Sequence, residues 1–291
     1  MVAFPRSVSL PNTNPKHEKS YHVRSTSLPC RSHPTISHVE HHLTSLRSWS
    51  SKPEDTSAWL LEGLTSLETL HASVDDLLQL PQSQELLRRK SGWVDELLED
   101  FLLFVDTYGT FKEALMSLKE LHSSAQAAIR RRDGAKIDSY VKARKKTERE
   151  VLKLLPELRS IRRRVLAMVF TSDVGEMELA AVLREVVMTT VEVSVSIFGG
   201  VSPSSSTSAG ALKARFGFGL SHKRGEGIRE VREVAAEDLC RAVKAADDDV
   251  RRVLDRLVAL EDCVGELERR SEHVFRGFIS TRVSLLNILT P

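Results

Sequence analysis

A run of apolar residues near the C-terminal end of the chain constrains its fold most strongly. Between positions 239 and 278, residues follow one another at alternating steps of four and three: Leu239, Val243, Ala246, Val250, Val253, Leu257, Leu260, Val264, Leu267, Ser271, Val274 and Phe278. This heptad pattern predicts a long helix that supercoils against a partner. The partner is either another helix of this chain or a second copy, so the pattern leaves a homo-oligomer open.

The rest of the chain also favours helices. Hydrophobic residues make up 41% of the sequence and aromatic residues only 5%, so the core must consist mainly of Leu, Val and Ala side chains. Apolar residues recur at helical spacing from Ile36 to Phe198. We therefore predict an all-α protein: an elongated helical bundle with a long C-terminal coiled-coil-like helix and a disordered N-terminal tail.

Composition divides the chain into four parts. Residues 1–35 are rich in Ser, Arg, His and Pro without an apolar period, which predicts a disordered tail. Residues 36–198 form the helical bundle, and 199–227, rich in Gly and Ser, form a flexible linker. Residues 228–289 form the heptad-patterned helix, which packs on the bundle or on a second chain.

Several boundaries inside the bundle follow from single residues. A helix should begin after Thr56 or Ser57 and stop at Pro81. The apolar pattern from Val94 onward predicts either two helices that meet at Gly109 or one bent rod. A further helix is expected over 174–198, with a strand as the alternative for 191–197 because β-branched residues are frequent there.

Two copies of one hexapeptide stand in the N-terminal part of the chain. They begin at Arg6 and Arg24, end at Pro11 and Pro29, and both fit Arg-Ser-x-Ser-x-Pro. A phosphate on Ser9 or Ser27 would add about two negative charges. Such a motif suits docking to a 14-3-3 protein, whose Arg cluster pairs with the phosphate. The alternatives are a chance match in a Ser-rich basic tail or a transit sequence.

The charges along the chain are unevenly distributed. Net charge is −8 over residues 51–129 and +9 over 130–165. The candidate basic surface contains Arg130, Arg131, Arg132, Lys142, Arg144, Lys145 and Lys146. Because no core accepts such a run, we expect it at the surface, paired with the acidic segment or touching an anionic membrane. Aromatic residues are not interleaved with it, so we do not expect nucleic-acid binding.

No arrangement of residues indicates catalysis. His38, His41 and His42 share one helix side, which we interpret as a solvated face rather than a metal site. The three cysteines lack CxxC spacing, and no stretch of 18 uncharged apolar residues predicts a membrane span. We therefore expect no catalytic residues, no cofactor, no metal and no enzymatic activity.

Four tracts resemble the shared blocks of the plant Bypass-related family. They are SYHVRSTSLPCRSHP at 20–34, VDDLLQLP at 74–81, WVDELL at 93–98 and TRVSLLNIL at 281–289. The resemblance implies a plant-specific, all-helical protein whose family is linked to root and shoot development through control of a mobile signal. It supplies no catalytic residues, and the hexapeptide at 6–11 lies outside its signature.

Motifs and resemblance together predict a plant non-enzymatic regulatory or scaffold protein with phosphorylatable N-terminal docking motifs, acting in the cytoplasm. The alternative is a peripheral membrane or organelle-targeted helical protein, in the chloroplast or at a membrane. It would use its basic helix and an acid-poor, transit-like N-terminal segment.

Overall fold

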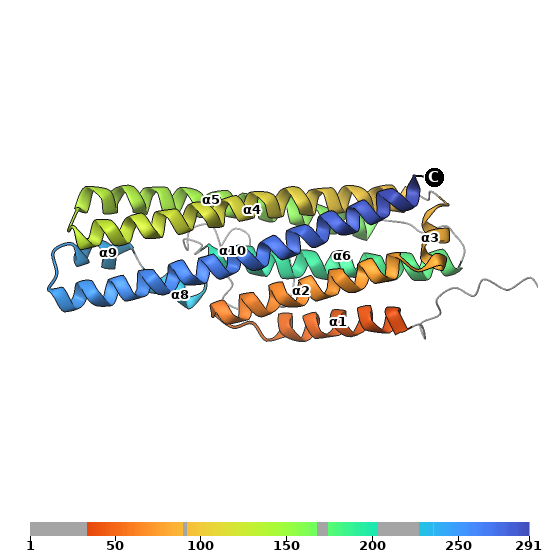
Figure 1. The fold of residues 1–291 in the computed structure, drawn as a ribbon, viewed down its shortest axis with the longest axis horizontal. Coiled ribbons are helices and arrows are strands. Elements are labelled where there is room, and N and C mark those ends of the chain that lie inside the picture. The colour runs from red at the N-terminus through yellow and green to blue at the C-terminus, as the bar shows by residue number, and fades with distance from the viewer. Residues whose placement is uncertain (1–33, 90–91, 168–173, 203–226, 235, 291) are drawn as a thin grey trace, which may run out of the picture.

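The computed structural model describes residues 34–89, 92–167, 174–202, 227–234 and 236–290. Its helices are α1 Pro34–Ser51, α2 Ser57–Leu78, α3 Pro81–Leu87, α4 Gly92–Arg130, α5 Gly134–Ala167, α6 Val174–Val201, α8 Arg229–Glu233, α9 Ala236–Ala242 and α10 Asp247–Leu289. The described residues include no strand, which confirms the all-α prediction. The long helices lie side by side in an elongated bundle (Figure 1).

Helix α10 crosses the bundle between α2 and α4 (Figure 1). It runs antiparallel to α4, as shown by ion pairs from Lys112 to Glu272 at 2.7 Å and from Lys119 to Glu268 at 3.2 Å. The buried residues of α10 include the seam positions Leu257, Leu260, Val264, Leu267, Ser271, Val274 and Phe278. Of the two partners that the heptad pattern allowed, the structure therefore uses helices of the same chain.

The prediction of one helix over 228–289 was wrong at its beginning. The chain forms α8 and α9 first, and α10 starts only at Asp247, preceded by Ala246 in an extended conformation. Asp247, Asp248 and Asp249 occupy the first turn of α10, where acidic side chains interact favourably with the helix dipole. The heptad spacing continues across this break, so apolar spacing alone gave no sign of it.

Other boundaries agree with the sequence in part. Helix α2 begins at Ser57, where the Thr56 hydroxyl accepts a hydrogen bond from the backbone N–H of Trp59, and it ends before Pro81. Helix α4 continues through Gly109, so the two-helix alternative was wrong. Gly109 faces α10, where a Cβ would make an ordinary van der Waals contact, 3.6 Å from the Phe275 ring.

The structure also gives the tail and the linker other boundaries than the sequence predicted. Residues 191–197 belong to α6, which excludes the strand alternative. Helix α6 continues to Val201, so the first residues of the predicted linker are helical, while 203–226 lie outside the described residues. Positions 34 and 35 belong to α1, and 1–33 lie outside the described residues. Helix α3 was not predicted.

An aromatic cluster fills the centre of the bundle, with Phe278 of α10 in its middle. The Phe278 ring centroid lies 5.1 Å from that of Phe104, 5.0 Å from Tyr108 and 4.7 Å from His71. These neighbours come from α4 and α2. A few aromatic residues thus join three helices in a core otherwise made mainly of Leu, Val and Ile.

Helix α1 is attached by a pair of stacked tryptophans. The Trp49 and Trp59 rings lie 4.1 Å apart, and the Trp49 indole N–H donates to the Trp59 carbonyl at 2.9 Å. The stack closes over Gly63, where a Cβ would lie 2.5 Å from the Trp49 ring. A side chain at position 63 therefore cannot coexist with this stack.

Replacement of Gly63 by Ala should lower the free energy of unfolding by about 1–3 kcal/mol, because the rigid Trp49 ring must move. Gly199→Ala is the matched control: it also lies inside a helix, but its Cβ would meet nothing within 4 Å. The control should be neutral or stabilising by up to about 1 kcal/mol. Urea unfolding followed by circular dichroism measures both, and equal effects would contradict the packing described.

Candidate functional site

The candidate basic surface lies where α4 ends and α5 begins. Arg130, Arg131 and Arg132 are exposed at the C-terminal end of α4, where cations interact favourably with the helix dipole. Arg132 also donates to the carbonyl of Ala245 at 2.8 Å and pairs with Asp247 at 2.7 Å, which links this end of α4 to α10. The exposed residues Lys142, Lys145 and Lys146 follow on α5.

Arg144 does not belong to this surface, and its assignment there was wrong. The residue is 8% exposed, and its guanidinium donates to the Glu148 carboxylate at 2.8 Å. It also donates to the carbonyls of Val234 at 2.6 Å and Val231 at 2.9 Å. These carbonyls lie at the end of the short helix α8, which leaves them without helical partners. The buried oxygen acceptors therefore explain why this one arginine of a basic run is buried in the core.

Arg144 belongs to a chain of polar contacts that joins three helices. It holds α5 against the end of α8, and the side chain of Glu230 in α8 reaches the start of α2. There Glu230 accepts hydrogen bonds from the Ser57 backbone N–H at 3.1 Å and the Ser57 hydroxyl at 2.7 Å. Ser202, which follows α6, donates to the carbonyl of Glu148 at 3.2 Å. This cluster fixes both described ends of the chain that flank 203–226.

A second polar cluster is buried among α2, α4 and α6. The His71 Nε2 atom lies 3.0 Å from the Thr190 hydroxyl, and the hydroxyls of Tyr108 and Ser194 are 2.8 Å apart. Ser194 also donates to the Thr190 carbonyl at 2.7 Å. Burial lowers the pKa of His71 to about 3, so the ring is neutral near pH 7. The cluster has the character of a packing network rather than of an acid–base pair.

His122 of α4 is a further buried histidine, close to α5. Burial is the main reason that its pKa falls to about 3, and the positive charge of Arg144 lowers it further. Its ring centroid lies 5.9 Å from that of Tyr140. Sequence reasoning missed both histidines, although each occupies an apolar position of its helix, three or four residues from buried neighbours.

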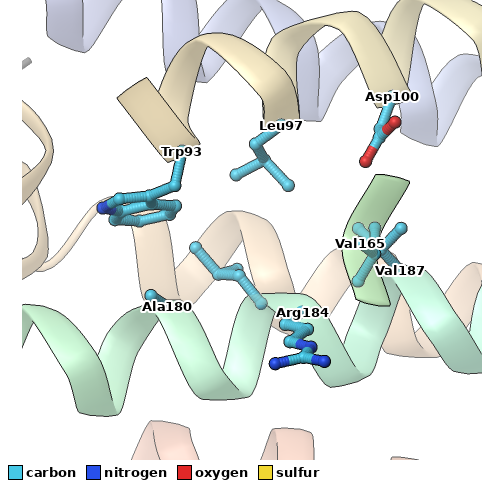
Figure 2. Close-up of a pocket in the computed structure, with 8 residues that line it drawn as sticks. Trp93, Leu97, Asp100, Val165, Ala180, Arg184 and Val187 are labelled. Atoms are coloured by element: carbon cyan, nitrogen blue, oxygen red, sulfur yellow. The ribbon is translucent and has the colours of Figure 1, made fainter. Parts of the chain in front are cut away.

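A small cavity lies beside Asp100, between α4, α5 and α6. Figure 2 shows its lining: Trp93, Leu97, Asp100, Val165, Ala180, Leu183, Arg184 and Val187. Its volume is ≈ 10 Å³, about the space for one water molecule. Burial raises the pKa of Asp100 to about 6, although Arg164 of α5 pairs with it. This ion pair confirms one charge match between the basic and acidic segments. The cavity itself is too small for an organic substrate.

The hexapeptide residues cannot be placed. Ser9, Ser27, Arg6, Pro11, Arg24 and Pro29 all lie outside the described residues. In the part of the chain that the structure describes, no His, Cys, Asp and Glu side chains gather in a group that could hold a metal ion. None of the described helices is long and apolar enough to cross a membrane.

Substitution of Arg144 by Ala should destabilise the protein by about 3–5 kcal/mol, because Glu148 and two carbonyls lose their buried partner. The neighbouring exposed Lys145→Ala is the control and should change stability by less than about 0.5 kcal/mol. Urea unfolding of both variants tests the assignment. A small effect at Arg144 would show that its side chain is solvated.

The buried histidines should make stability depend on pH below 6.5. Folding holds His122 neutral down to its lowered pKa of about 3, whereas the unfolded chain binds a proton from about pH 6.5 downward. The free energy of unfolding therefore contains the full contribution of the neutral ring above pH 6.5. At pH 4 this free energy is lower by roughly 3 kcal/mol.

This pH dependence is measured by comparing the wild type with His122→Leu. The unfolding free energy of the variant should fall less steeply between pH 6.5 and 4, by about 1.4 kcal/mol per pH unit. The comparison is needed because Asp100, with its pKa raised to about 6, titrates in this window with the opposite sign. Identical slopes would mean that His122 is not buried in a neutral form.

The comparisons with known proteins concern most of the described body. The family model of Protein BPS1 matches residues 63–288, from within α2 to near the end of α10. The searches of curated proteins and of solved structures gave no match. The matched range contains His71 and Arg144 and excludes both hexapeptides. The chain therefore belongs to the Protein BPS1 family, the plant family that its sequence blocks resemble.

Proposed function

We propose that this protein is a non-enzymatic regulatory scaffold whose helical body carries phosphorylatable N-terminal docking motifs. One observation supports this reading above others: the buried polar side chains of His71 and Arg144 form hydrogen bonds between helices and do not line a cleft. His71 reaches Thr190 of α6, and Arg144 reaches the end of α8. Such groups stabilise an arrangement of helices, which is what a body that presents binding segments requires.

The twin hexapeptides are the segments that we assign to partner binding. Ser9 and Ser27 are 18 residues apart, and Ser27 precedes the start of α1 at Pro34 by seven residues. Eighteen residues span up to about 60 Å when extended, enough for two phosphates to reach two grooves of one dimeric partner. We propose a 14-3-3 protein as that partner and the cytoplasm as the compartment. Binding of one phosphoserine would hold the other at a high effective concentration near the second groove, which would raise the overall affinity.

Phosphorylation of the full chain by a basophilic kinase should create binding to a 14-3-3 dimer, measured by isothermal titration calorimetry. Ser9→Ala/Ser27→Ala should abolish this binding, and either single change should weaken it by roughly a hundredfold through loss of the second site. Ser20→Ala/Ser32→Ala is the matched control, because it alters two serines of the same segment that lie outside both hexapeptides. Undiminished binding by the Ser9→Ala/Ser27→Ala variant would refute the docking function.

A further inference from the structure

The outer side of α5 carries a row of positive charges, here called the basic row: Lys142, Lys146, Arg149, Lys153 and Arg163. All five side chains are exposed. The first four follow at steps of four, three and four, which places them on one side of the helix. Arg163 lies ten residues further along, about a quarter of a turn around the helix axis from Lys153. Arg144 lies on another side and is excluded from the row by its burial.

The described part of the protein leaves most of the row without counter-charges. Lys142, Lys146, Arg149 and Arg163 form no ion pair there, and Lys153 pairs with Glu150 at 2.9 Å in an exposed position. Asp138 and Glu157 border the row, but the side keeps an excess of positive charge. Neighbouring like charges repel one another on a helix surface. An external anionic surface would remove this repulsion.

The row faces away from the rest of the molecule. Helix α5 packs against α4, α6 and α9, with Val151, Leu158 and Ile161 among its buried residues. It lies along the outer edge of the bundle beside α4 (Figure 1). From Lys142 to Arg163 the row extends about 30 Å. A row of this length fits an extended, uniformly charged surface better than it fits one phosphate group.

We propose that the basic row docks the protein on the surface of an anionic membrane. Each Lys or Arg close to such a surface contributes a similar favourable increment, so several together give salt-sensitive binding. Nucleic acid fits less well, because the row contains no aromatic side chain on which a base could stack.

This inference goes beyond the proposed docking function and is independent of it. Phosphate on Ser9 or Ser27 is not needed for the row to act, and loss of the hexapeptides would leave α5 unchanged. The two ideas therefore fail separately: calorimetry with a 14-3-3 dimer tests one, and vesicle binding by the unphosphorylated chain tests the other.

Co-sedimentation of the full chain with vesicles tests the proposal. Vesicles with roughly 30% phosphatidylserine should bind the protein at about 0.1 M salt, and pure phosphatidylcholine vesicles should not. Lys142→Gln/Lys146→Gln/Arg149→Gln should weaken binding by about tenfold or more. The control Lys52→Gln/Lys244→Gln/Arg251→Gln removes three exposed cations from other elements and should bind like the wild type.

A charge-preserving variant separates the row from any effect on folding. Lys142→Arg/Lys146→Arg/Arg149→Lys should bind vesicles like the wild type, and thermal unfolding should show that all variants are folded. Equal losses in the row variant and the control, or absence of wild-type binding, would overturn the proposal. Tighter binding to duplex DNA than to the anionic vesicles at the same salt concentration would also overturn it.

Discussion

The fold depends on the burial of one seam, along which α10 packs between α2 and α4. Helix α10 has 43 residues and spans about 65 Å, and it packs against both the 39-residue α4 and the shorter, 22-residue α2. Phe278 brings the three helices together, with Phe104 stacked on it at 5.1 Å and His71 at 4.7 Å.

Buried polar groups fix how the helices of this apolar bundle are positioned along one another. Leu and Val layers tolerate sliding, whereas hydrogen bonds between buried groups are made only in one arrangement, and breaking them is costly. The contact of His71 with Thr190 fixes α2 against α6, and Arg144 fixes α5 against α8. The fold therefore has its strictest requirements inside, while its charged outer surface can serve for contacts with partners.

Local signals in the sequence predicted much of the fold. Thr56 and Pro81 marked the ends of α2, and the heptad spacing identified α10. The burial of Arg144 was not predictable, because its acceptors belong to residues about 90 positions later in the chain. For the same reason the sequence could not choose between a partner helix in this chain and one in a second copy. Among the candidate site residues, those of the basic surface are exposed as expected except for Arg144, and the hexapeptides lie outside the described residues.

Hydrogen exchange followed by mass spectrometry tests the central claim, burial of the α10 seam within one chain, most directly. The backbone amides between Leu257 and Ile288 should be among the slowest to exchange, because they lie in the best-buried part of the helix. Their protection should stay the same when the protein is diluted about a hundredfold, since no second chain supplies the seam's partners. Protection that disappears on dilution would contradict the account and show that α10 packs between chains.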